Sequence, residues 1–341
     1  MNKITAMNQN ISFFIYLLFA LLLIIFAGLR PLGFDADLNG YYGIMENIIH
    51  NEYLLIEPAF IIITKLSYFF VGIEYYQRLV VVVFAIIHIT TLAYAFMKLS
   101  KYPFYSLIIY SLLFYPILGL TQIRYSIIVS LFLIAIPDII NKKAGLFYLK
   151  ILIAFSFHYS AIIFLPFYFL NPLHMNTLKY KILLYTSLVM PFLNGLLFNL
   201  IIAIFNLNLL PEYVEAKIYS NLINNYDTSG IHTFNIMSIL LVLFSVLYLY
   251  FFNNIKNNTK NIVLLKVYIL GIFLYMILSF SNVIAFRMLN GIAIVIVLLL
   301  SNTFNLYKEK NFVLILIIFI SIIIFFNTTV RNELLNWNIL I

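Results

Sequence analysis

The chain has 341 residues, of which 64% are apolar and only 9% are charged, and its mean hydropathy is +1.05. A soluble globular domain carries about 25% charged residues, so the composition excludes a soluble enzyme and predicts a membrane protein. The 20 basic and 12 acidic residues do not indicate nucleic-acid binding, because the basic ones are scattered through short loops. The absence of cysteine excludes disulfides, a thiol nucleophile and a thiolate metal site.

Apolar segments of spanning length recur along the whole chain. They predict an all-α, polytopic transmembrane helix bundle with about 9–11 membrane segments, formed as a single integral membrane domain over residues 1–341. The first 28 residues have the layout of a signal peptide, but with so many later spans we expect an uncleaved first helix. The predicted spans lie near 11–28, 77–97, 103–119, 122–140, 181–205, 234–252, 262–281, 283–303 and 311–326.

Residues 54–73 do not read as an ordinary span. They contain Glu57, Pro58 and Lys65, with polar positions near one face. Such a pattern suits an amphipathic helix that lies in the membrane interface. We therefore expect residues 29–76 to form one outer loop that includes this interfacial helix.

Residues 146–170 are also unusual, because His158, Ser160 and Pro166 interrupt an otherwise apolar run. The distribution of lysines along the chain requires this segment to enter the membrane and return, or to cross it imperfectly. We expect a re-entrant element here.

The lysines fix the expected sidedness. If the N-terminus is cytoplasmic and 54–73 stays on the outer surface, five pairs of lysines fall in cytoplasmic loops, as the positive-inside rule requires. Making 54–73 a true span would move the first two of these pairs outside. Lys150 and Lys266 lie a few residues into spans and are expected to snorkel to the cytoplasmic surface. The pairs are Lys98 and Lys101, Lys142 and Lys143, Lys179 and Lys181, Lys256 and Lys260, and Lys308 and Lys310.

All five arginines fall on the opposite, outer side, where cations should be rare. Guanidinium groups match phosphate oxygens in bidentate fashion, so we expect a diphosphate-bearing substrate at the outer face. The two largest hydrophilic segments, within 29–76 and at 206–233, lie on the same side. The arginines are Arg30, Arg78, Arg124, Arg287 and Arg331.

The first outer loop combines two carboxylates and two tyrosines within a short stretch that follows Arg30. Asp35 or Asp37 can accept the proton of an attacking hydroxyl or orient it. Two acids alone make a poor metal site, so no metal is expected. The alternative is a solvated turn in which Asp37 caps a helix that starts near Leu38.

Gln122 and Arg124 stand at the outer mouth of the 122–140 span, and Arg287 lies inside the start of 283–303. An ionisable group within a span indicates a site with a partner, although either arginine can instead anchor lipid head groups. For Arg78 and Arg331 the anchor interpretation is favoured.

Two histidines lie in apolar surroundings. His158 is either a proton-transfer group or an interhelical hydrogen-bonding contact, whereas His88 reads as structural. The chain has no His, Asp and Glu spacing typical of zinc, and no phosphate-binding loop or dinucleotide fingerprint. Transport driven by nucleotide hydrolysis in this chain alone is therefore not expected.

Taken in order, these motifs resemble the EpsG family of bacterial polysaccharide proteins, which is related to the Wzy-type O-antigen and capsule polymerases. The resemblance spans about residues 28–290 and departs at three places. Phe34-Asp35-Ala36 loosens a Gly-Thr-Asp element, Ala59 replaces a glycine, and Tyr125-Ser126 replaces Gln-Ala. The matching residues are Arg30, Gly33, Asp37 and Tyr41, then Glu57-Pro58-Ala59-Phe60, then Gln122-Ile123-Arg124, then His158-Tyr159-Ser160-Ala161, then Arg287.

The resemblance implies a glycosyltransferase with a GT-C-like arrangement that joins oligosaccharide repeat units carried on undecaprenyl diphosphate, at the periplasmic face of the bacterial inner membrane. No cofactor is expected. Implied partners are the lipid-linked oligosaccharide, membrane lipids, and a chain-length regulator and flippase of the same pathway. The expected roles are diphosphate binding by Arg124, Arg287 and Arg30; catalysis by Asp37 or Asp35 with His158; and substrate binding by Tyr41, Tyr42, Glu57, Gln122 and Arg78.

Three other functions compete. A flippase predicts internally repeated halves and charges on both sides of a central cavity, which the one-sided polar features do not match. A membrane acyltransferase predicts a cytoplasmic histidine near an acyl donor, for which His158 is the contender. A structural scaffold leaves the intramembrane Arg287 unexplained.

Overall fold

The computed structural model describes residues 3–53, 55–205, 233–306, 308–331 and 334–340. Throughout these ranges the regular structure is helical, and extended pairing is limited to one isolated bridge between Asp35 and Leu335. The prediction of an all-α, polytopic membrane bundle is confirmed.

Six helices among the described residues are long and apolar enough to cross a membrane. Two further pairs are bent at a short break and bring the number to eight if each pair counts as one span; three shorter apolar helices have 10–17 residues. The six are Ser12–Leu29, Pro58–Leu99, Ile123–Ile140, Thr259–Phe280, Asn282–Thr303 and Lys310–Val330; the bent pairs are Pro103–Leu113 with Tyr115–Thr121 and Thr177–Ser187 with Met190–Leu200; the shorter helices are Ala144–Phe157, Tyr159–Phe169 and Ile236–Tyr250.

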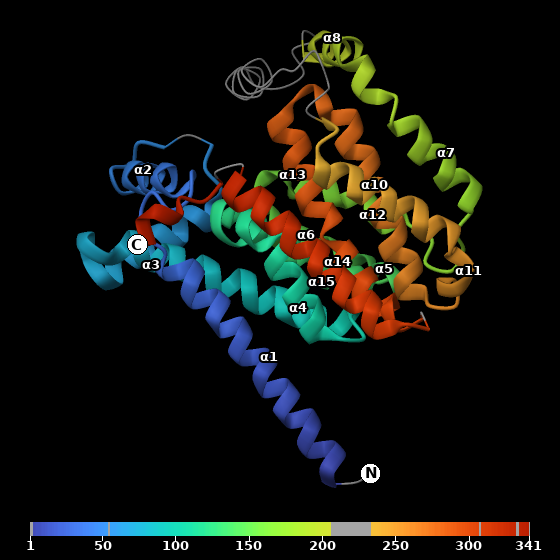
Figure 1. The fold of residues 1–341 in the computed structure, drawn as a ribbon. Helices are drawn as coiled ribbons and strands as arrows, with labels where there is room; N and C mark the ends of the chain where they lie inside the picture. The colour runs from blue at the N-terminus through green and yellow to red at the C-terminus, as the bar shows by residue number, and fades with distance from the viewer. Residues whose placement is uncertain (1–2, 54, 206–232, 307, 332–333, 341) are drawn as a thin grey trace. The chain divides into compact units, whose positions relative to one another are not determined.

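The chain divides into two compact units, one formed by 1–170 and 297–341 and the other by 171–296. In the first unit, α1 (Lys3–Leu29) and the second half of α3 (Pro58–Leu99) run antiparallel (Figure 1). The Tyr16 hydroxyl donates to the Ala93 carbonyl at 2.7 Å. At the other end of the pair, Gly28 packs so closely on Val82 that a Cβ would meet its side chain at 2.9 Å.

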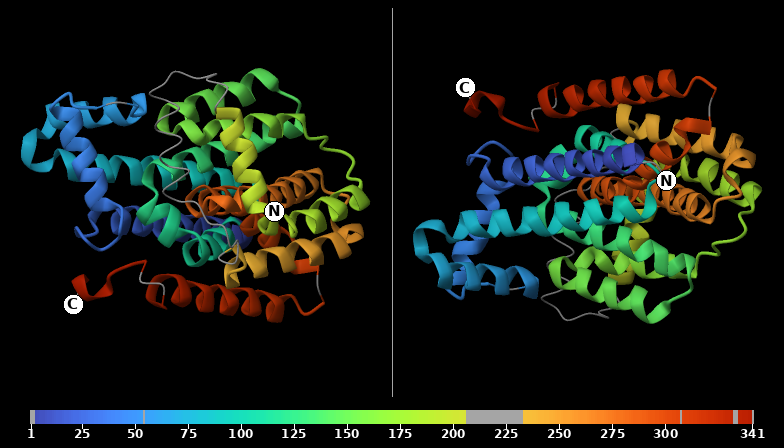
Figure 2. Two further views of the ribbon diagram at one scale, coloured as in Figure 1. Left: turned by 90° about the horizontal axis from the view of Figure 1, so that it is seen from above. Right: turned by 90° about the horizontal axis from the view of Figure 1, so that it is seen from below.

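The long helix α3 is a hairpin rather than one rod (Figure 2). Gly72 has φ 72° and ψ −173°, a conformation that side chains exclude and glycine permits. The chain folds back there, so that Tyr68 packs on Tyr76 and Phe60 packs on Phe84, each pair with ring centroids 5.4 Å apart. The segment predicted to be an interfacial helix is thus the first arm of this hairpin.

Three helices of the first unit meet at a buried histidine. His88 of α3 lies 2.7 Å from the hydroxyl of Tyr110 on α4 (Pro103–Leu113) and 2.6 Å from Ser130 on α5 (Ile123–Ile140). Both ring nitrogens are therefore satisfied inside the bundle. This agrees with the structural role that the sequence favours. Between α4 and α5 the chain forms the π-helix η1 (Tyr115–Thr121).

Residues 144–169 form a hairpin. The helix α6 (Ala144–Phe157) leads to His158, and the 3-10 segment η2 (Tyr159–Phe169) leads back. At the far end of the hairpin, Lys142 Nζ donates to the Leu170 carbonyl at 2.7 Å, and the rings of Tyr148 and Tyr168 lie 5.3 Å apart. The turn at His158 is consequently the apex of this hairpin, and its re-entry into the membrane stays a prediction from the sequence.

The last helices return the chain to the first loop. The helix α14 (Val295–Thr303) is followed by η6 (Phe304–Leu306). Near the end of α14, Asn302 Oδ1 accepts a hydrogen bond from the Lys101 backbone N–H at 2.6 Å. The chain then runs through α15 (Lys310–Phe326) and η7 (Asn327–Arg331) to η8 (Trp337–Leu340). There the Asn336 N–H donates to the Phe34 carbonyl at 2.8 Å, so the C-terminal segment packs on the first loop.

The second unit is also helical. Gly271 of α12 packs against Ile292 of α13, and no side chain fits between them. Lys266 corrects an expectation, because its ammonium does not snorkel: the residue is buried and donates to the carbonyls of Asn171 and His174. The elements are α7 (Thr177–Ser187), η3 (Met190–Leu193), α8 (Asn194–Phe205), α10 (Ile236–Tyr250), α11 (Phe252–Ile255), α12 (Thr259–Ile277), η5 (Leu278–Phe280) and α13 (Asn282–Ala293).

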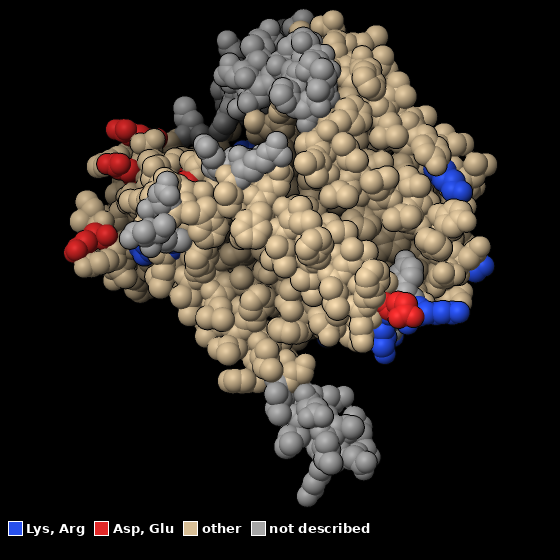
Figure 3. Space-filling model, viewed as in Figure 1, with Lys and Arg blue, Asp and Glu red and all other residues tan. Residues whose placement is uncertain are grey.

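The first unit has two chemically distinct ends. We call the end that carries the first loop, α2 (Leu38–Ile49) and the turn of α3 the acid end, because exposed Glu46, Glu52 and Glu74 gather there (Figure 3). The opposite end, where α3 and α5 finish, is the lysine end; it carries Lys98, Lys101, Lys142 and Lys143.

This arrangement predicts the accessibility of single cysteines, for which the cysteine-free chain is a ready background. Asn39→Cys and Asn336→Cys should react with an impermeant thiol reagent from the same side of the membrane, and Lys143→Cys should react from the other. Labelling of Asn39→Cys and Asn336→Cys from opposite sides would contradict the path of the chain described above.

Candidate active site

A buried carboxylate lies at the centre of the candidate site. Glu57 is the N-cap residue of α3, and Pro58 takes the first helical position, where its missing N–H costs nothing. Glu57 is 5% exposed, and its Oε2 lies 2.5 Å from Arg124 Nη1. The buried charge is therefore paired, and the start of α3 stabilises it further.

Arg124 projects from the first turn of α5 into an aromatic cage. Its guanidinium lies 5.4 Å from the ring centroid of Tyr41 and 5.2 Å from that of Phe60. Its Nε is buried and has no hydrogen-bond partner among the described residues. The side chain as a whole is 19% exposed, so part of this cation is accessible from outside the protein.

Gln122 precedes Arg124 at the junction of η1 and α5. Its side-chain Oε1 is buried and, within the described part of the chain, accepts no hydrogen bond. An orphaned buried acceptor costs about 1–3 kcal/mol, so such groups call for a partner outside the described residues. This segment thus offers both an unused acceptor and an unused donor.

His158, at the apex of the hairpin formed by α6 and η2, reaches the same cluster. Its Nδ1 lies 3.9 Å from Glu57 Oε1, and its ring meets the ring of Tyr125 edge-on at 5.7 Å. The backbone N–H of Ser160 donates to Nδ1 at 3.2 Å. Because Nδ1 is an acceptor, the neutral ring carries its proton on Nε2, which is then a donor. The Tyr159 hydroxyl donates to the Ile56 carbonyl at 3.1 Å and ties the hairpin to the loop before Glu57.

Arg30 and Asp35 form a second buried ion pair, with Nε and Oδ2 2.6 Å apart and side chains 1% and 0% exposed. The remaining guanidinium nitrogens of Arg30 donate to the carbonyls of Ala27 and Leu120. Every nitrogen of this guanidinium therefore has a protein partner. Arg30 joins the end of α1 to η1 and to the first loop.

Asp35 and Asp37, the two acids of the first loop, differ in their hydrogen bonds to the start of α2. Asp35 Oδ1 accepts from the backbone N–H groups of Asp37 at 3.1 Å and Leu38 at 3.0 Å, so it is Asp35 that caps α2. The alternative in which Asp37 is the capping side chain is wrong, although the helix does begin at Leu38. Asp37 is exposed and makes no side-chain cap bond.

The other predicted substrate-binding residues line the same end. Tyr42 packs beside Gln77, which donates to its carbonyl at 3.2 Å. Burial raises the pKa of the Tyr42 hydroxyl, although the charges of Arg78 and Arg30 act in the opposite direction. The hydroxyl therefore stays protonated at neutral pH and can donate. Arg78 Nη1 donates to the carbonyls of Gly28 and Arg30 and so braces α3 against the first loop.

Four segments thus bring Tyr41, Glu57, Arg124 and His158 together, with Gln122 beside them. Arg287 lies in the second unit, exposed on α13. The second large outer loop, with Glu212, Glu215 and Asp227, lies outside the described residues. The described residues hold no group of three or more His, Asp or Glu side chains arranged for a metal ion.

The model of the EpsG family matches residues 13–339. The chain belongs to the EpsG family. No curated protein and no solved structure matches it in the same comparisons. Membership associates this membrane protein with a function related to polysaccharide polymerisation.

The two loop acids should respond differently to neutralisation. Asp35→Asn leaves the Arg30 guanidinium buried without a counter-charge, so we expect a loss of stability of about 3 kcal/mol. Asp37→Asn alters an exposed group and should change stability by less than about 0.5 kcal/mol. Thermal unfolding in detergent measures both. Equal unfolding temperatures for the two variants would contradict the clamp role of Asp35.

Proposed function

We propose that this EpsG family protein is a polysaccharide polymerase that joins undecaprenyl-diphosphate-linked oligosaccharide repeat units at the outer face of the inner membrane. The observation that carries the proposal is the state of Arg124. It is held by Glu57 through one nitrogen and caged by two rings, yet its Nε and part of its surface remain unused. Such a cation suits a diphosphate oxygen.

In the proposed reaction, the acceptor hydroxyl oxygen attacks the anomeric carbon of the growing glycan. The bond between that carbon and the diphosphate oxygen breaks, and the lipid diphosphate leaves with the electron pair. Negative charge develops on the leaving oxygen. Arg124 stabilises it by its positive charge, and neutral His158 stabilises it by donating a hydrogen bond from Nε2–H. Arg287 lies in the second unit, and its role as a diphosphate ligand stays a prediction from the sequence.

The acceptor hydroxyl must lose its proton as it attacks. We assign Asp37 as the general base, because this residue is exposed, whereas Asp35 is buried and is committed to Arg30 and to the start of α2. Arg30 then serves to hold the loop, a different role from the diphosphate ligand that the sequence predicts.

The sugar rings need polar and flat contacts. The orphaned Oε1 of Gln122 can accept from a sugar hydroxyl, and the Tyr42 hydroxyl can donate to one. Tyr41 is already covered by Arg124, so in this proposal it supports the cation and does not stack on sugar.

Replacement of Arg124 by lysine, which keeps the positive charge, tests whether Arg124 binds the diphosphate. Arg124→Lys should lower the rate of chain growth by about 10²–10³-fold, because one directional donor set at the leaving group is lost. The glycan ladder on gels and the amount of protein in membranes give the readouts. Lys143→Arg, an exchange at the lysine end, is the matched control and should leave the ladder intact. Normal polymerisation by Arg124→Lys would show that the leaving group binds elsewhere.

Neutralisation of Asp37, the proposed general base, should prevent formation of the first glycosidic bond between repeat units. With Asp37→Asn, lipid-linked single repeats should accumulate and the ladder should disappear, whereas Glu46→Gln, an exposed acid on the same helix, should retain it. A flippase would instead lose the single repeats from the outer face. An intact ladder in Asp37→Asn together with an essential acid in 206–233 would move the base to the second outer loop.

A further inference from the structure

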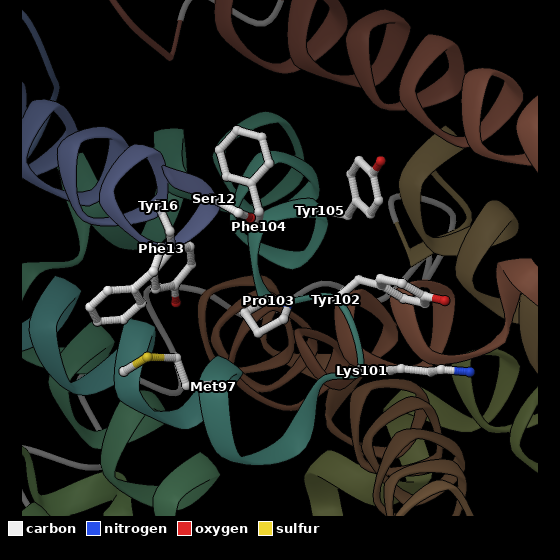
Figure 4. A pocket seen from close by; sticks show the side chains of 9 residues that line it. All are labelled: Ser12, Phe13, Tyr16, Met97, Lys101, Tyr102, Pro103, Phe104 and Tyr105. Carbon is white, nitrogen blue, oxygen red and sulfur yellow. The ribbon is translucent and has the colours of Figure 1, made fainter. Parts of the chain in front are cut away.

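A pocket of about 530 Å³ opens at the lysine end of the first unit, away from the Glu57 and Arg124 cluster (Figure 4). Its volume falls within the usual range of small-molecule sites. Three segments form it: the first turns of the membrane part of α1, the last turn of α3 and the start of α4. The lining residues are Ser12, Phe13, Tyr16, Met97, Lys101, Tyr102, Pro103, Phe104 and Tyr105.

The aromatic rings that line the pocket pack against residues outside it. Phe104 packs edge-on against Phe19 with centroids 6.1 Å apart, and Phe304 packs on both Tyr102 and Tyr105, at 4.9 and 5.5 Å. Since these rings are held from outside the pocket, they do not need to rearrange to receive a ligand. The pocket is preformed.

The backbone at the pocket rim is fixed as well. The hydroxyls of Ser100, Ser106 and Ser301 lie within 2.9 Å of one another in a triangle that joins α4 to α14. The Lys101 N–H donates to Asn302. The Lys101 side chain, in contrast, is exposed, with its ammonium 5.6 Å from the Tyr102 ring centroid, and Figure 4 shows the two polar tips pointing the same way, on the side opposite to Phe13 and Met97.

The pocket is amphiphilic and positively charged. Lys101 is a cation, Lys98 lies three residues before it, and the lining residues include no acid. Phe13 and Met97, 51% and 38% exposed, extend the wall along the apolar flank of the helices. One polar, cationic rim beside an apolar wall matches a phosphate that is attached to hydrocarbon chains.

We propose that this pocket binds one anionic phospholipid of the leaflet at the lysine end, with its phosphate at Lys101 and its upper acyl chains against Phe13 and Met97. Basic pockets between membrane helices on the cytoplasmic side are typical sites for such head groups. The site lies at the end of the unit opposite to the candidate active site, so the proposal does not rest on the polymerase function.

Native mass spectrometry of the detergent-purified chain provides the test, with phosphatidylglycerol and phosphatidylcholine titrated in parallel. Wild-type protein should retain one phosphatidylglycerol in preference to phosphatidylcholine. Lys101→Gln should weaken that binding about fivefold, which corresponds to about 1 kcal/mol and is the contribution of one lysine near a lipid phosphate. Lys143→Gln removes a lysine at the same end but outside the pocket and should leave binding unchanged.

A second variant tests the contribution of the cavity to lipid binding separately from that of the charge. Ser12→Trp fills the pocket without altering charge and should lower phosphatidylglycerol binding at least as much as Lys101→Gln does, with thermal unfolding confirming that the variant is folded. Equal binding of the two lipids, or equal effects of Lys101→Gln and Lys143→Gln, would overturn the proposal. Displacement of phosphatidylglycerol by equimolar undecaprenyl phosphate would also overturn it, since the pocket would then serve a prenyl phosphate.

Discussion

The buried pair of Arg30 and Asp35 is the constraint on which the acid end depends. One guanidinium reaches the end of α1, the carbonyl of Leu120 in η1 and a carboxylate that in turn caps α2. Removing either charge would leave the other without compensation in a dry interior. Because this pair fixes the start of α2, it also fixes where Asp37 and Tyr41 are presented.

Arg124 is built for a different purpose. Both arginines pair with a carboxylate, but Arg30 is fully hydrogen-bonded and closed off, whereas Arg124 keeps an unused buried donor and an accessible side chain. The aromatic cage and Glu57 hold its planar group in one orientation, which a flexible lysine would not maintain. This preorganisation is what a site for developing negative charge requires.

Much of this organisation could be predicted from the sequence. Apolar segment lengths indicated the helical bundle, and the motifs singled out Glu57, Gln122, Arg124 and His158, which the fold brings together or places side by side along the chain. The interruption at His158 correctly indicated a break in the helix, and the structure has the turn of a hairpin there. These features are local: each depends on residue types and spacing within one segment.

Other features depend on contacts between segments and could not be predicted. The sequence favoured Asp37 as the base but left open which acid matches the family motif. Their different environments arise because Asp35 pairs with Arg30, whose guanidinium also binds the distant carbonyl of Leu120. The sequence separated residues 54–73 from the span at 77–97, but it did not indicate that the chain folds back at Gly72, since composition does not reveal a positive φ. Lys266 was expected to snorkel, yet the carbonyls that bind it come from a loop about ninety residues away.

The most direct test of the account is the steady-state kinetics of the purified chain reconstituted in liposomes with a lipid-linked repeat unit. One undecaprenyl diphosphate should be released for each glycosidic bond formed. Arg124→Lys should lower kcat about 10²–10³-fold while KM changes little, because the contact strengthens mainly as the leaving group gains charge. An Arg124→Lys variant with unchanged kcat, or bond formation without release of the diphosphate, would contradict it.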